Sequence, residues 1–156
     1  MSSLEHKFVD LDNAYLEIFR GSLGHPIVCC QHPHSSNLRL FQWYAEKTGF
    51  IYVLVRGMGN SSPVQEKSDL TYLQAVNDLE AVRRKLGIDR WVMQGYSAGS
   101  QVALLYALTY PDSLAGLISI SGFARISSLK ENPHSRCSPR YPDYQADYAA
   151  LRGQQV

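Results

Sequence analysis

Short apolar segments alternate with longer segments of helical periodicity through most of this chain. The later apolar segments are apolar on both faces, which is the pattern of strands that helices cover on both sides of a parallel sheet. Strands and helices that alternate in this way form right-handed βαβ units. The sequence therefore predicts an α/β fold with three layers, in which a mainly parallel sheet has helices on both faces. The predicted strands are 27–30, 50–55, 91–94 and 117–121, and a period-2 run at 15–19 predicts an antiparallel partner.

The clearest predicted helix runs from residue 69 to residue 86. Its apolar residues recur at steps of three and four, so they share one stripe of the helix surface. Ser68 is a suitable N-cap, and Gly87 can take the left-handed position after the last turn. Two further helices are predicted at 38–48 and 98–109. The stripe consists of Tyr72, Val76, Leu79, Val82 and Leu86.

The character of the sequence changes after Gly122. Residues 1–123 carry the strand and helix pattern, whereas residues 124–156 are rich in proline, serine and tyrosine without a sustained period. We expect the first range to form the N-terminal part of an α/β core and the second to be the start of a lid or a mobile tail.

Charge and composition exclude several classes of function. The formal net charge is +1, with both signs scattered along the chain, which argues against a nucleic-acid-binding protein. The chain has no apolar run of roughly 20 residues and does not begin like a signal peptide, so we expect a cytoplasmic protein without a membrane partner. The three cysteines lack metal-ligand spacing, and no metal site is expected.

The segment that carries chemistry is Gly95-Tyr96-Ser97-Ala98-Gly99, between a predicted strand and a predicted helix. A serine at the apex of a sharp strand-to-helix turn has a strained backbone, and larger side chains two positions before and after it would collide. Gly95 and Gly99 meet that requirement. The amide of Ala98 would lie at a helix N-terminus, where partial positive charge favours a developing oxyanion. The same pattern also occurs in ordinary tight turns with a solvent-facing serine.

These residues give the chain a resemblance to the α/β-hydrolase family over about residues 15–122. In that family, a His-Gly-x-x loop follows the first parallel strand and donates one oxyanion amide. The corresponding stretch here is residues 32–35, so the resemblance implies His34 as a second oxyanion donor through its backbone amide, although Pro33 replaces the usual glycine. Residues 56–61, Arg-Gly-Met-Gly-Asn-Ser, are similar to a turn that supports the site in many family members, and we assign them no chemistry.

Ser97 needs a histidine as base and an acid that orients this histidine. In the family both follow the nucleophile on later strands, in the order serine, acid, histidine. After Ser97 the chain has one histidine, His134, and Asp143 and Asp147 follow it in the reverse order. We therefore expect this chain to lack a complete triad, to be inactive alone, and to depend on a missing C-terminal half or a partner chain that completes the sheet.

Two functions are compatible with the sequence. The first is a serine hydrolase that cleaves a small ester or amide substrate through an acyl-enzyme at Ser97, without a cofactor. Serine at this position argues against the dehalogenases and epoxide hydrolases of the fold, which use aspartate. The second is a non-catalytic binding or interaction protein that keeps the crevice.

Overall fold

The computed structural model describes residues 4–21, 24, 27–31, 49–122 and 142. The chain divides into two units, Met1–Gly122 and Phe123–Val156, and the fold described below is that of the first unit. The predicted helix at 38–48 and the predicted loop at 32–35 lie outside the described residues.

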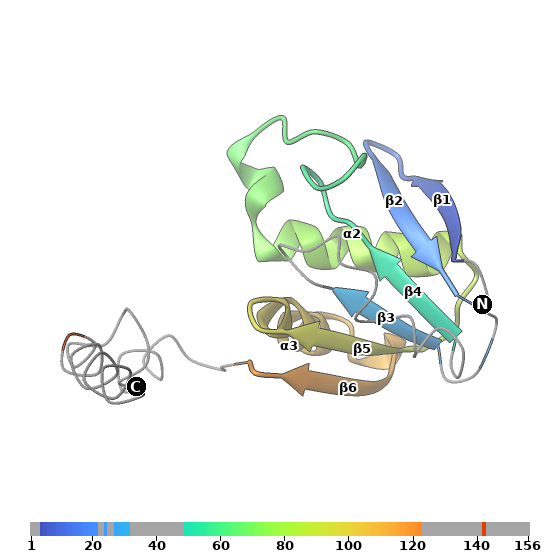
Figure 1. Cartoon of the computed structure of the whole chain (residues 1–156), viewed down its shortest axis with the longest axis vertical. Helices are drawn as coiled ribbons and strands as arrows, with labels where there is room; N and C mark the ends of the chain where they lie inside the picture. Colours follow the sequence, from blue (N-terminus) through green and yellow to red (C-terminus); the bar gives the residue numbers. More distant parts are fainter. Residues whose placement is uncertain (1–3, 22–23, 25–26, 32–48, 123–141, 143–156) are drawn as a thin grey trace, which may run out of the picture. The chain divides into compact units, whose positions relative to one another are not determined.

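A six-stranded sheet forms the centre of the first unit (Figure 1). The strand order is β1-β2-β4-β3-β5-β6, so the order of winding reverses at β3. β4, β3, β5 and β6 are parallel to one another. β1 pairs antiparallel with β2, and β2 pairs antiparallel with β4, as the period-2 run predicted for β2. The fold is therefore α/β with a mostly parallel sheet. The strands are β1 (Glu5–Asp10), β2 (Tyr15–Arg20), β3 (Ile27–Gln31), β4 (Gly49–Val53), β5 (Trp91–Tyr96) and β6 (Leu114–Ile120).

Side chains of the central strands are buried on both faces of the sheet. One face carries Ile51, Val53 and Met93, which form a single core with α2 (Tyr72–Lys85) and α3 (Gly99–Thr109). The other face carries a second buried cluster that includes Phe50 and Tyr52. Both described α-helices thus cover the same face, and the burial of the second face fits the prediction of apolar strands between two layers.

Helix α2 begins three residues later than the sequence predicted. Thr71, not Ser68, is the N-cap, and its hydroxyl accepts a hydrogen bond from the Gln74 amide at 3.1 Å. Ser68 and Asp69 lie instead in a 3₁₀ turn, Lys67–Leu70, that precedes the helix. The predicted stripe is correct for its buried members, but Tyr72 in the first turn is 45% exposed. At the other end, Gly87 has a φ of +66°, the left-handed conformation that was predicted for it.

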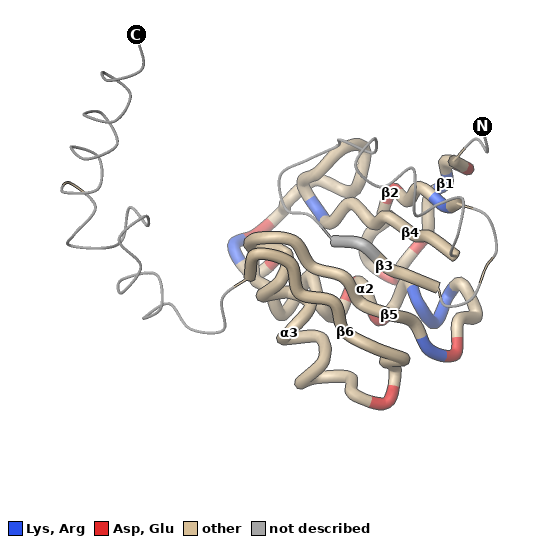
Figure 2. Tube along the Cα trace, turned by 60° about the horizontal axis from the view of Figure 1, so that its bottom comes forward, with Lys and Arg blue, Asp and Glu red and all other residues tan. Residues whose placement is uncertain are grey.

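Strand β6 ends the described sheet and presents an apolar surface. Leu117 and Ile118 are 39% and 37% exposed. Figure 2 shows charged residues spread along the chain, whereas β6 and α3 carry none. An apolar strand at the edge of a sheet tends to recruit another strand.

Glu80 of α2 is the polar centre of the contact between α2, α3 and the following 3₁₀ turn. It is 3% exposed and accepts hydrogen bonds from Arg83, Arg84 and Tyr106, the last at 2.6 Å. Ser113 donates a longer bond of 3.3 Å. Burial alone would raise the pKa of Glu80, but the hydrogen bonds and the charge of Arg83 outweigh it and lower the pKa to about 2.

Glu80 makes the stability of this fold depend on pH. Its pKa is lower in the folded protein than the ordinary value of 4.5, so its contribution is complete above pH 4.5 and is lost as the pH falls toward 2. A shift of this size corresponds to about 3 kcal/mol. We expect Glu80→Gln to lower the free energy of unfolding by up to this amount at pH 7 and by far less near pH 2, measured by urea denaturation. Glu5→Gln, at a half-exposed carboxylate, is the control. An equal loss of unfolding free energy in Glu80→Gln at both pH values would contradict the lowered pKa of Glu80.

Candidate active site

The strand-to-helix turn predicted around Ser97 is present and is strained. Strand β5 ends at Tyr96 and helix α3 begins at Gly99, which leaves two residues for the reversal. Ser97 has a φ of +53°, a left-handed conformation that residues other than glycine rarely adopt. Its side chain is exposed, and its amide donates a 2.8 Å hydrogen bond to the carbonyl of Ile120 in β6. Backbone strain of this kind persists where the surroundings enforce it, which is common at active sites.

Gly95 is required by the close approach of the helix. A Cβ at this position would lie 2.3 Å from the Gly99 carbonyl oxygen and 2.5 Å from the Cα of Ser100. Both contacts are with backbone atoms, which cannot move aside without opening the turn. Gly99 is buried and forms the other side of this contact. The absence of a side chain at Gly95 therefore allows the helix to begin directly over the end of β5.

Ala98, the first of the two predicted oxyanion donors, lies at the start of α3. The residue is the N-cap of α3, with φ −60° and ψ −28°. Within the described part of the chain, no acceptor takes a hydrogen bond from its amide, whereas the amides of Ser100 and Gln101 are bonded back to Ser97 and Ala98. A free N–H at a helix N-terminus favours negative charge. The other predicted donor, His34, lies outside the described residues.

The turn at residues 56–61 packs tightly against strand β2. Gly57 and Gly59 both have a positive φ, and a Cβ at Gly59 would lie 2.3 Å from a carboxylate oxygen of Glu17. The Ser61 hydroxyl donates to the carbonyl of Leu54 at 2.7 Å and accepts from the amide of Glu17 at 2.9 Å. This turn is thus fixed to the sheet by backbone and side-chain bonds.

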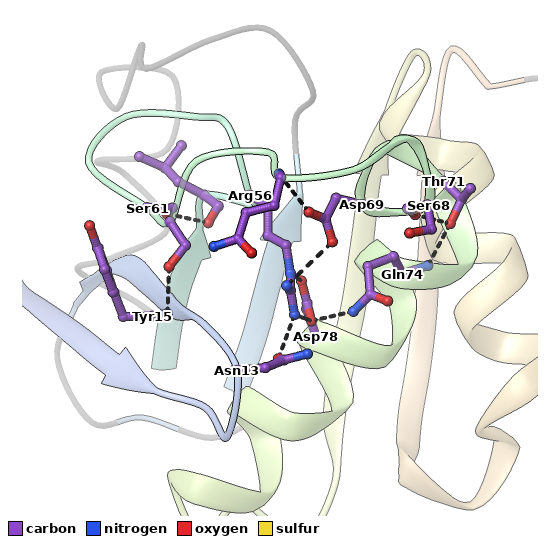
Figure 3. Close-up of polar contacts among 12 residues, drawn as sticks. Asn13, Tyr15, Arg56, Ser61, Ser68, Asp69, Thr71, Gln74 and Asp78 are labelled. Carbon is purple, nitrogen blue, oxygen red and sulfur yellow. Dashed lines mark hydrogen bonds and ion pairs between the residues drawn. The ribbon is translucent and has the colours of Figure 1, made fainter.

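Arg56 ties the same turn to helix α2 through a buried ion pair (Figure 3). Its guanidinium donates two hydrogen bonds to Asp78, at 2.7 and 2.9 Å, and one to Asn13 at 2.8 Å. A carboxylate oxygen of Asp69 lies 3.4 Å from Nη1 of Arg56. The bonds to Asp78 raise the pKa of Arg56, and the pair is almost completely buried. The arrangement is that of a structural support, as the family resemblance implied for this turn, and its partner on α2, Asp78, was not predicted.

A catalytic base for Ser97 is not found among the described residues. The one histidine in these ranges is His6 in β1, which contacts Glu17 at 2.7 Å. His134, Asp143 and Asp147 lie outside the described residues. The same ranges contain no group of three histidine, cysteine or acidic side chains that could hold a metal ion. Within them, the helices also lack the length and apolar content of a membrane span.

The fold and the turn at Ser97 define an α/β-sheet protein with a serine at a strand-to-helix elbow. A family model described as the alpha/beta hydrolase fold matches residues 51–148, which is more than half of the chain. The chain therefore belongs to the alpha/beta hydrolase fold family, and the resemblance inferred from the sequence is confirmed.

Curated relatives of the chain include proline iminopeptidases. A probable proline iminopeptidase of Leptolyngbya boryana is 33% identical over 111 residues, which cover 69% of this chain and 35% of the relative. The proline iminopeptidase of Arabidopsis thaliana is 33% identical over 122 residues, which cover 75% of this chain and 32% of the relative. The chain thus spans about a third of the length of these two relatives.

Solved structures agree on the fold. An alpha/beta fold family hydrolase from Bacillus anthracis superposes with a TM-score of 0.79 at 22% identity, covering 97% of this chain and 56% of that chain. An epoxide hydrolase mutant of Vigna radiata superposes with a TM-score of 0.67 at 18% identity, covering 76% of this chain and 39% of that chain. At these identities the likeness extends to the fold alone.

Proposed function

We propose that this chain carries the nucleophile of a serine hydrolase, Ser97, which cleaves an ester or amide bond through an acyl-enzyme. The single observation that carries the proposal is the strained, exposed Ser97, followed by Ala98 at the N-cap of α3, whose amide has no acceptor in the described part of the chain. A serine in a relaxed surface loop would have neither the strained backbone nor the free helix-terminal amide after it. Membership of the hydrolase family supports the same chemistry.

The reaction follows from this geometry in two steps. Ser97 Oγ attacks the substrate carbonyl carbon while a base removes the hydroxyl proton, and the Ala98 amide binds the oxyanion that forms. The family resemblance implies the backbone amide of His34 as the second oxyanion donor. The base then transfers the proton to the leaving amine or alcohol as the bond to carbon breaks, which leaves the acyl group on Ser97. A water molecule hydrolyses this acyl-enzyme and restores the serine.

The base and the acid of this reaction come from outside the described residues. His6 is in β1, at the edge of the sheet remote from β5, and is paired with Glu17. The exposed Leu117 and Ile118 of β6 support a second element of the proposal, that another strand adds to this edge in the active assembly. That strand belongs either to the rest of the hydrolase core or to a partner chain.

The substrate that we propose to test first is a peptide or arylamide with an N-terminal proline. The relatives named above are proline iminopeptidases, which supports amide cleavage over other reactions of the family. Serine at position 97 is the nucleophile of acyl transfer, whereas epoxide hydrolases of this fold use aspartate there.

A fluorophosphonate probe tests the nucleophile directly. The protein, purified from cells in its native assembly, is expected to be labelled at Ser97, identified by mass spectrometry of the modified peptide. Ser97→Ala should lose the label, and Ser68→Ala, at an exposed serine in the 3₁₀ turn before α2, should keep it. Absence of labelling in the native assembly would overturn the proposal and would favour a non-catalytic binding protein.

A further inference from the structure

Ser100 is a fully buried hydroxyl in the first turn of helix α3, three residues after the nucleophile. Its hydroxyl donates to the carbonyl of Gly95 at 2.9 Å and has the carbonyl of Ile120 at 3.2 Å as a second acceptor. These carbonyls belong to β5 and β6, the two neighbouring strands at the end of which the elbow lies. One side chain therefore connects the start of α3 to both strands.

The Ile120 carbonyl also holds the backbone of the nucleophile. The Ser97 amide donates to it at 2.8 Å, so Ser97 and Ser100 share one acceptor. The other acceptor of Ser100 is the carbonyl of Gly95, which lies at the start of the turn, two residues before Ser97. The hydroxyl thus reaches a carbonyl on each side of the strained residue, and a shift of either one would turn the Ser97 backbone.

The chain that follows β6 closes the space around Ser100 on one side. A Cβ at Gly122 would lie 2.2 Å from the Ser100 Cβ and 2.6 Å from its Oγ, so the chain after β6 passes directly over this side chain. Ser121, between Ile120 and Gly122, has a φ of +52° and is the second non-glycine residue in the described ranges with a positive φ. Two strained serines, 97 and 121, therefore flank the contact that Ser100 makes.

An ordinary helical serine gives a different pattern. Serine hydroxyls inside helices commonly bond to a carbonyl three or four residues earlier in the same helix. Ser100 instead reaches five residues back into a strand, and a second strand 20 residues onward. Its hydroxyl therefore bonds to carbonyls of the two strands at the turn and not to a carbonyl of its own helix.

We propose that Ser100 is a positioning residue of the reaction at Ser97. Its hydroxyl fixes the carbonyls of Gly95 and Ile120, and through them it sets the direction of the Ser97 hydroxyl and of the Ala98 amide. The inference rests on the function proposed above. A nucleophile misplaced by about 1 Å can lose roughly 100-fold in rate, so a small relaxation of the elbow has a large effect on chemistry.

The test compares Ser100→Ala with Ser113→Ala, a matched control. Ser113 is also a buried serine that donates a side-chain bond, but it follows the far end of α3 and bonds to Glu80. Both variants should lower the melting temperature. Ser100→Ala alone should slow the labelling of Ser97 at saturating fluorophosphonate by about 10- to 100-fold, with the half-saturating concentration nearly unchanged. Ser100→Cys keeps a weak donor and should restore part of the labelling rate. It replaces the alanine variant in this comparison if Ser100→Ala does not fold.

A second readout does not depend on activity. Hydrogen exchange of the Ser97 amide is expected to be at least about 10-fold faster in Ser100→Ala than in Ser113→Ala, because the shared Ile120 acceptor is no longer held. Faster exchange with no labelling of the wild type would reject the proposed function, and it would leave Ser100 as a residue that holds the backbone of the turn. Unchanged exchange, or labelling of Ser100→Ala at the wild-type rate, would overturn the positioning role.

Discussion

Ser97→Ala is expected to lower hydrolysis of a proline arylamide or a simple ester by at least about 10⁴-fold in the native assembly, because the attacking atom is removed and the remaining groups of a triad give little rate without it. The proposal assigns bond formation to one oxygen, so no neighbouring serine can take over. Initial rates of product release at saturating substrate, with the wild type and variant at equal concentration, measure the effect.

Ser97→Gly separates this chemical role from the backbone strain. Glycine adopts a φ of +53° without penalty, whereas serine and alanine both bear a penalty of about 1 kcal/mol there. The glycine variant should therefore be as inactive as Ser97→Ala and yet more stable than it by about that amount. A glycine variant that is no more stable would contradict the strain, and an alanine variant that keeps its activity would contradict the nucleophile.

The elbow could be predicted because all of its determinants are local in the sequence. A buried strand, a serine between two glycines at fixed spacing and a helix are visible within residues 91–109, and the structure has Ser97 at a positive φ between them. The parallel strands were predictable for a similar reason, since burial on both faces makes each one a continuous apolar run.

Strand β1 was not predicted because its sequence does not look apolar. Residues Glu5–Asp10 expose all side chains except that of Val9, which is 7% exposed. As an edge strand, β1 gains its stability from hydrogen bonds to β2 instead of from burial, and only the pairing reveals it.

The predicted start of α2 was wrong because it also depends on contacts that are not local in the sequence. Ser68 and Asp69 fit a helix cap locally, but Asp69 accepts bonds from the amides of Gln65 and Glu66 and lies beside Arg56.

The supports of the site depend on contacts that are distant in the sequence. Ser100 appears in the sequence as one polar residue in an apolar helix, and nothing local reveals that its acceptors lie in two different strands. Asp78 gave a weak signal, because it is a charged residue next to the apolar stripe of α2. Arg56 lies 22 residues away from it in the chain, and only the packing of the turn on α2 brings the two charges together.

Asp78→Ala is expected to lower the free energy of unfolding by about 3–5 kcal/mol, since it leaves the Arg56 guanidinium buried without its main partner. The side chains of Arg56 and Asp78 are 7% and 4% exposed, so water cannot replace the lost bonds. Within the described ranges, Asn13 and the more distant Asp69 remain as the only other acceptors of the guanidinium. Urea denaturation at pH 7 measures the change.

Two controls separate the buried charge from the loss of packing. Lys7→Ala breaks an ion pair with Glu5 in which both side chains are about half exposed, and it should change stability by less than about 1 kcal/mol. The double variant Arg56→Met, Asp78→Leu removes both charges and should be more stable than Asp78→Ala, because an apolar pair of similar volume does not leave a charge unpaired. A double variant as unstable as Asp78→Ala would mean that shape, and not charge, makes this contact essential to the turn at residues 56–61.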